Sequence, residues 1–182
     1  MTSPLAVVEI DPSRVSASLA RLIEHHHPFT RDCLAELAPL CRRVVAAHAT
    51  RHPEVLVVDD LVSSLRAELL PHMEKEERVL FPWVVQLVRA ARDGQRLAPP
   101  PFRSVRNPIW VMVGEHGVAL EIVAELEEVT HSFTAPTDAC GSYRRLYTTL
   151  GGLAADLREH IRVEDLELFP AALSLESRLL GG

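Results

Sequence analysis

The chain has 182 residues, of which 47% are hydrophobic and 24% are charged, so it can fold around one core of its own. Its formal net charge of -6 argues against a surface that binds nucleic-acid phosphates, and we expect no nucleic-acid partner. No apolar run approaches the roughly 18 residues that span a bilayer, and the start MTSPLAVVEIDPSR lacks the pattern of a signal peptide. We therefore expect a cytoplasmic protein without a membrane partner.

Two amphipathic helices are predicted in the first half of the chain. Apolar residues that recur in alternating steps of three and four predict the first helix over residues 11–49, with Asp11 and Pro12 at its start and His52-Pro53 beyond its end. The Asp59-Asp60 pair predicts the start of the second helix, whose apolar stripe extends to Leu87. On this second stripe, polar residues occupy positions where leucines are expected.

Two further helices are predicted in the second half. A Pro-rich connector, APPPFRSVRNP, precedes a third helix with an apolar stripe from Ile109 to Leu126. The loop SFTAPTDACG precedes a fourth helix, whose stripe extends to Leu168. No segment alternates with period two, so no strands are expected. The fold class we predict is all-α, an antiparallel up-down-up-down four-helix bundle.

A repeated motif carries the strongest chemical signal. HMEKEERVLFP (residues 72–82) and HIRVEDLELFP (160–170) both read His-x-x-x-Glu-x-x-x-Leu-Phe-Pro. Residues four apart share one helix face, so His72 lies beside Glu76, and His160 lies beside Glu164. A buried carboxylate needs a positive partner, and neither stripe carries a lysine or arginine. A lone His-x-x-x-Glu is more often a solvated pair, but two copies at equal offsets favour a pair of metal ions bridged by the two carboxylates.

Other candidate residues complete this site. His116 lies at the centre of the third stripe, whereas the first helix offers consecutive histidines. His26 and His27 both flank its apolar face, and periodicity does not choose between them. His48 is either a further ligand or a histidine near a helix end. Glu68 and Glu115 are close enough to hydrogen-bond a ligating imidazole or to line a path to the metals.

The blocks HMEKEERVLFP, NPIWVMVGEHGVALEI and DLREHIRVEDLELFP resemble the hemerythrin-like di-iron bundles, in particular the bacterial family that takes part in repair of iron centres. The resemblance extends from about Leu19 to Leu173. It divides the chain into an N-terminal extension (1–18), a hemerythrin-like di-iron domain (19–175) and a C-terminal tail (176–182). It implies two iron ions with an oxo or hydroxo bridge, although the ligand types also suit manganese. The ligands that it implies, with the glutamates bridging, are His27, His72, Glu76, His116, His160 and Glu164.

The same resemblance places His48, Glu68 and Glu115 at positions that the family associates with the site. Two departures accompany it. Full-length repair proteins carry an additional N-terminal domain with a cysteine pair, and residues 1–18 contain no cysteine. Oxygen-carrying hemerythrins have a second histidine where this chain has Leu120, although Asp165 matches the position of their aspartate.

We therefore expect a stress-response protein that repairs iron-sulfur clusters by iron donation, by nitric oxide or dioxygen chemistry, or by both. Its partners would be a small diatomic ligand and iron-sulfur proteins. The alternative is a protein that binds or senses a diatomic gas or iron without catalysis or repair. A third possibility is a metal-free bundle with hydrogen-bonded polar groups in its core. Whether the protein is an enzyme is left open.

Overall fold

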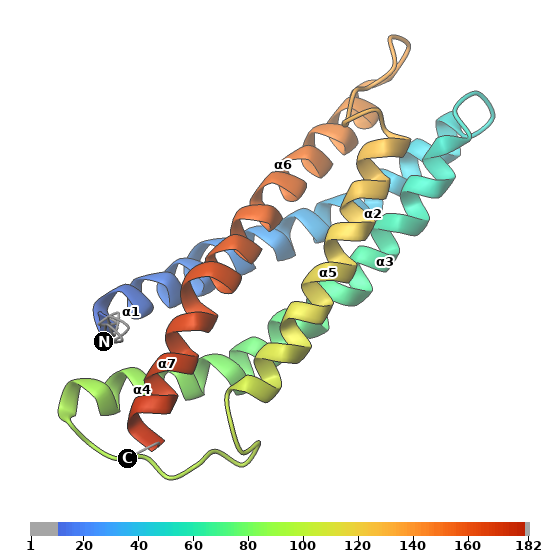
Figure 1. Cartoon of the computed structure of the whole chain (residues 1–182). Helices are drawn as coiled ribbons and strands as arrows, with labels where there is room; N and C mark the ends of the chain where they lie inside the picture. The colour runs from blue at the N-terminus through green and yellow to red at the C-terminus, as the bar shows by residue number, and fades with distance from the viewer. Residues whose placement is uncertain (1–10, 181–182) are drawn as a thin grey trace, which may run out of the picture.

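The computed structural model describes residues 11–180, and these form four long helical rods (Figure 1). Three rods contain a π-helical turn, and no strand occurs between residues 11 and 180. The first rod packs against the second and the fourth, and the second also packs against the third. The predicted all-α antiparallel bundle is confirmed. In chain order the rods are α1 (Pro12–Arg21), η1 (Leu22–His26) and α2 (His27–His48); α3 (Glu54–Lys75), η2 (Glu76–Leu80) and α4 (Phe81–Asp93); α5 (Arg106–Val129); and α6 (Gly141–Val163), η3 (Glu164–Leu168) and α7 (Phe169–Leu180).

The helix ends follow local signals with one exception. Asp11 caps α1 as predicted, since its side chain accepts a hydrogen bond of 2.8 Å from the backbone N–H of Ser13. The predicted start of the second rod at Asp59-Asp60 is wrong, because α3 already begins at Glu54. Val55 and Val58 are buried there, so packing extends the helix through residues that resemble a cap.

The helices also extend beyond the limits predicted for the domain. Helix α1 lies largely within the predicted extension 1–18 and buries Val15, whereas residues 1–10 lie outside the described part. Helix α7 extends to Leu180 and enters the predicted tail, of which residues 181–182 are not described. None of the helices between residues 11 and 180 combines the length and apolarity that a bilayer span requires.

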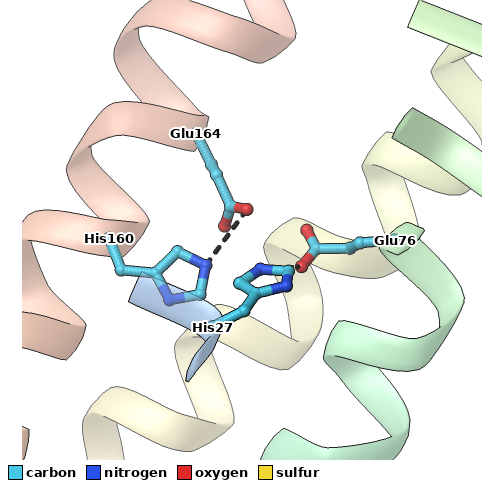
Figure 2. Close-up of side chains that lie close together, drawn as sticks. All are labelled: His27, Glu76, His160 and Glu164. Atoms are coloured by element: carbon cyan, nitrogen blue, oxygen red, sulfur yellow. Dashed lines mark ion pairs between the residues drawn. The ribbon is translucent and has the colours of Figure 1, made fainter. Parts of the chain in front are cut away.

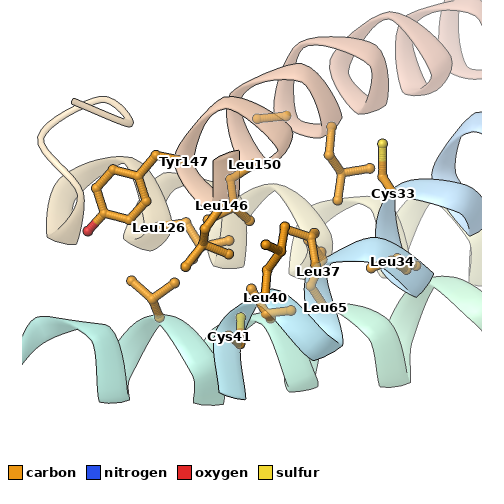
Figure 3. Close-up of a cluster of buried hydrophobic side chains, with 14 of the residues drawn as sticks. Cys33, Leu34, Leu37, Leu40, Cys41, Leu65, Leu126, Leu146, Tyr147 and Leu150 are labelled. Atoms are coloured by element: carbon orange, nitrogen blue, oxygen red, sulfur yellow. The ribbon is translucent and has the colours of Figure 1, made fainter. Parts of the chain in front are cut away.

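The apolar interior is divided into two clusters along the bundle. One cluster joins α2, α3, α6 and the second half of α5, and Figure 3 shows part of it, including Leu37 and Leu146. The other joins α1, α4, α7 and the first half of α5. In the first three rods, the stretch between the two clusters carries one or more buried histidines, and in the second rod also Glu76; in the fourth rod, His160 and Glu164 flank the boundary between the clusters. The polar layer therefore lies across the middle of the bundle, with apolar packing on both sides.

The three π-helical turns share a feature of the sequence, whereas Pro39 and Pro71 lie within regular α-helix. Pro28, Pro82 and Pro170 each lie two residues after such a turn. A proline ring inside an α-helix clashes with the carbonyl four residues earlier. Here the residue before each proline donates its backbone N–H to the carbonyl five residues back, as Phe81 does to Glu76. His27 and Phe169 make the equivalent bonds to Leu22 and Glu164. The wider turn admits the proline, so the rod continues past a residue that would kink or end a regular α-helix.

A buried carboxylate ties together the end of the bundle where α7 packs against α4. Glu176 on α7 accepts hydrogen bonds from the Trp83 indole at 3.1 Å, the Ser104 hydroxyl at 2.6 Å and the Val105 backbone N–H at 2.8 Å. These three donors belong to α4 and to the connector before α5. Each donor satisfies part of the carboxylate's need for hydrogen bonds, which makes its burial tolerable.

Candidate metal centre

Side chains from all four rods meet in the polar layer. They form two groups of potential metal ligands, and in each group the donor atoms lie within 4.8 Å of one another. Both groups contain Glu76 and Glu164, and each adds two histidines of its own. Figure 2 shows the first group, with His27 and His160 directed toward the two carboxylates. The second group adds His72 and His116.

The distances within the centre are those of a closely packed cluster. Glu76 Oε2 lies 3.4 Å from His27 Nε2 and 3.3 Å from His72 Nε2. Glu164 lies 3.0 Å from His116 Nε2 through Oε2 and 3.1 Å from His160 Nε2 through Oε1. Each carboxylate thus contacts one histidine from each group, as a ligand shared by two cations would.

The protein groups alone do not satisfy these carboxylates. Glu76 and Glu164 are fully buried, and none of their four oxygens has a hydrogen-bond partner among residues 11–180. The ion pairs found for them in this part of the chain involve histidine nitrogens, not lysine or arginine. Leaving an ionised carboxylate in this state costs several kcal/mol.

A second set of carboxylates fixes the orientation of three imidazoles. The Nδ1 atom of His27 lies 2.7 Å from Glu77, that of His72 lies 2.9 Å from Glu115, and that of His116 lies 3.0 Å from Asp165. An Nδ1–H that donates to a carboxylate leaves the Nε2 lone pair free for a metal. His160 differs, because its Nδ1 is buried and has no such partner within residues 11–180.

The hydrogen bonds at Nδ1 of His72 and His116 leave the space between their Nε2 atoms suited to a cation. His72 Nε2 and His116 Nε2 lie 3.2 Å apart, and both donate at Nδ1 when the rings are neutral. Without a proton on either Nε2, two lone pairs would face each other across this gap, beside carboxylate oxygens. Positive charge between them relieves the repulsion, and imidazole with carboxylate is a donor set that suits iron or manganese. The residues present therefore fit a pair of metal ions.

The pKa values of these groups reflect burial first and their neighbours second. Burial lowers the pKa of His27 to about 4, with the neighbouring His160 acting in the same direction, and burial also lowers the pKa of His72. Both imidazoles are thus neutral near pH 7, as ligation requires. Burial and the nearby Glu164 raise the pKa of Glu76 well above its usual value.

The other two groups respond mainly to their neighbours. Burial would raise the pKa of Glu164, but His160 and His116 outweigh it and hold this pKa below its usual value. Burial would likewise lower the pKa of His116, but Asp165 and Glu164 outweigh it and raise this pKa to about 9. A proton on His116 therefore compensates Glu164, whereas Glu76, whose pKa is raised, has no lysine or arginine partner among residues 11–180. One proton does not satisfy the centre.

Aromatic rings close the layer on one side. Phe81 stacks on the His27 imidazole with 5.5 Å between ring centroids, and Phe169 stacks on His116 at 5.9 Å. Both phenylalanines belong to the repeated Leu-Phe-Pro, directly after a π-helical turn. Each copy of the repeat therefore supplies two candidate metal ligands, the π-helical turn that begins at the second of them, and the phenylalanine ring that covers the layer.

The remaining candidates from the sequence lie in different places. On the first rod the structure brings His27 into the cluster, whereas His26 pairs with Asp156 at 3.0 Å and stacks on His160. Glu68 is exposed and borders a small pocket beside His72 and Glu115, so it lies at an opening to the centre.

Glu77 was not predicted from the sequence, because a residue that directly follows a buried one is expected to face elsewhere on a regular helix.

His48 is not brought to the centre. It lies at the opposite end of α2, about 30 Å along the helix from His27. There its Nε2 is 3.2 Å from the Cys140 sulfur, and its ring lies 5.2 Å from that of Tyr143. Periodicity alone places it on the correct face but does not measure the distance along the rod. We leave it out of the ligand set.

Comparison with known proteins agrees with this geometry. Residues 18–172 match the Hemerythrin HHE cation binding domain. The chain therefore belongs to the hemerythrin HHE family, whose domain binds cations.

Among its relatives are proteins named for repair of iron-sulfur clusters. The chain is 36% identical over 157 residues to the iron-sulfur cluster repair protein DnrN of Neisseria gonorrhoeae, covering 86% of this chain and 90% of the relative. It is 34% identical over 176 residues to the iron-sulfur cluster repair protein YtfE of Cronobacter sakazakii, covering 94% of this chain and 74% of the relative. The resemblance expected from the sequence motifs is confirmed.

Proposed function

We propose that this protein holds two iron ions and acts in stress-linked repair of iron-sulfur clusters. The observation that carries the proposal is the pair of ligand groups that share both Glu76 and Glu164. The proposed ligands are His27, His72, Glu76, His116, His160 and Glu164. When bound, the two ions would supply redox capacity and open coordination positions for a diatomic ligand such as nitric oxide or dioxygen.

The chain's own residues would prepare this centre. Glu77, Glu115 and Asp165 hold three imidazoles with Nε2 directed inward, so little ordering is needed when a metal arrives. The two apolar clusters keep bulk water from both ends of the layer. The opening beside Glu68 and Glu115 offers a small ligand a way in.

The balance between ligand charge and metal charge at the centre supports a role in which iron is released to another protein. Two carboxylates offset only part of the charge of two ferrous ions, and the four imidazoles are neutral when they ligate. A centre made entirely of carboxylates would hold these ions more tightly. Relatives named for iron-sulfur cluster repair suggest the recipient, a damaged iron-sulfur protein. The cysteines are free, as in a reducing compartment, and we place this activity in the cytoplasm.

Reactivation of a damaged cluster tests the proposal. The protein is loaded with ferrous iron without oxygen, cleared of excess iron, and mixed with an iron-sulfur dehydratase whose cluster has lost iron. We expect activity to return in proportion to the iron supplied. Glu164→Ala should supply little, whereas the exposed His131→Ala should match the parent. Intact binding of nitric oxide or dioxygen without any reactivation would instead indicate a gas sensor.

A further inference from the structure

A second cluster of metal-binding side chains lies beside the centre, toward the surface. Asp156 on α6 faces His25 and His26, the last two residues of η1. Its Oδ1 atom lies 3.4 Å from His25 Nε2 and 3.0 Å from His26 Nδ1. Donor atoms from all three residues lie within 4.8 Å of one another. None of the three belongs to the ligand set proposed above.

The spacing is that of ligands around one cation. Donors about 2.1 Å from a metal lie roughly 3.0 Å apart in octahedral and roughly 3.4 Å apart in tetrahedral coordination. The two measured distances fall at the two ends of this range, and the shorter one is also the length of the hydrogen bond that His26 and Asp156 make without a cation. Two imidazoles and one carboxylate form a set that ferrous iron accepts readily.

The hydrogen bond between His26 and Asp156 does not satisfy both oxygens of the Asp156 carboxylate. Asp156 Oδ2 is buried and has no hydrogen-bond partner among residues 11–180. Only 12% of the Asp156 side chain and 2% of the His26 side chain are exposed, so water does little to compensate them. His25 is 63% exposed, which gives a cation in solution direct access. A bound cation would supply the charge that Asp156 lacks.

The cluster also touches the centre. The His26 ring stacks on the ring of His160, with 5.5 Å between centroids and 21° between planes. His160 is the proposed ligand whose Nδ1 has no carboxylate partner, so its orientation is the least constrained of the four. Side-chain exposure falls from 63% at His25 through 2% at His26 to 1% at His160. These residues form a continuous line of imidazoles from solvent to the centre.

We propose that His25, His26 and Asp156 form a third metal site, open to solvent, through which a divalent cation passes to or from His160. The existence of the site is independent of cluster repair, whereas the passage of iron through it rests on the function proposed above. The site would hold its cation with three protein ligands and water, and so less tightly than the centre.

Counting bound metal in the full chain tests the site. Protein loaded with two iron ions is titrated with Mn²⁺, and bound Mn²⁺ is measured by electron paramagnetic resonance. We expect one further equivalent, which His25→Ala and Asp156→Asn should each abolish while the two iron ions stay bound. The matched control is Glu159→Gln, which changes a half-buried carboxylate three residues further along the fourth rod that pairs with Arg21 and Arg162 and not with the three proposed ligands. An extra equivalent that survives both variants, or no extra equivalent in the parent, would overturn the proposal.

Iron release tests the passage separately. A ferrous chelator is added to the iron-loaded parent, His25→Ala and the Glu159→Gln control, and the rate of iron loss is followed by absorbance. His25→Ala should lose iron several-fold more slowly than both others, with unchanged iron content at the start. Equal rates would refute passage by this route. If the parent fails to hold two iron ions at all, the function proposed above fails, yet a single equivalent that depends on His25 would still establish the surface site.

Discussion

Replacing Glu76 with glutamine should change stability in opposite directions with and without metal. Both oxygens of this residue are buried, and neither has a hydrogen-bond partner in the described part of the chain. Burial raises the pKa of Glu76, so at neutral pH folding must either protonate this carboxyl group or bury its charge, and a neutral isostere removes that cost of about 1–3 kcal/mol from the metal-free protein. For a chain of this size, the midpoint of thermal unfolding should rise by about 2 to 12 °C.

With iron present, the order of stability should reverse. A cation at about 100 times its dissociation constant stabilises the folded chain by about 2.7 kcal/mol for each site. Both ligand groups contain Glu76, so Glu76→Gln weakens both sites and should lose much of this gain. Calorimetric melts in a chelator and in anaerobic ferrous iron measure the two effects.

Glu74→Gln is the matched control for this experiment. Glu74 lies on the same helix, is exposed and pairs with Arg78 at 2.7 Å. Both of its melts should stay within about 0.5 kcal/mol of the parent. If Glu76→Gln destabilises the metal-free protein, the carboxylate has a protein partner and the reasoning is wrong. If the variant gains as much from iron as the parent, Glu76 is not a shared ligand.

Four further outcomes follow from named contacts. Glu115→Gln should weaken metal binding by about 10- to 100-fold in a competition titration, because it disturbs the carboxylate that orients His72. His48→Ala should retain two irons by elemental analysis, because His48 lies at the far end of α2. Glu176→Ala should lower the free energy of unfolding by about 3 kcal/mol in urea, since three donors lose their acceptor. Leu37→Ala should lower it by about 2 to 5 kcal/mol, because this side chain is fully buried.

The rods and the centre of the site were accessible from sequence for one physical reason. Helical periodicity states which residues share a face, and buried stripes cannot hold ionised groups without compensation. Glu76 and Glu164 therefore stood out among leucines. Helical periodicity also puts His72, His116 and His160 on the buried stripes. The structure brings these three histidines and the two glutamates together with His27.

Periodicity fails where the helix changes its pitch. At η1 five residues occupy one wider turn, so two consecutive histidines both face inward, and a step of 100° per residue does not separate His26 from His27. Glu77 and Asp165 escaped the argument for a similar reason, since each directly follows a buried glutamate at the start of such a turn. The prolines at equal offsets after the three turns were the available signal. His48 shows the complementary failure, because a shared face does not imply proximity.

The central claim is that two cations lie between Glu76 and Glu164. Crystals of the anaerobically iron-loaded protein, measured with X-rays on either side of the iron absorption edge, test it most directly. The account predicts two iron peaks in the polar layer, one beside His27 and His160 and the other beside His72 and His116, with both glutamates reaching both ions. A single peak, or side chains that bond to one another around water in iron-loaded crystals, would contradict it.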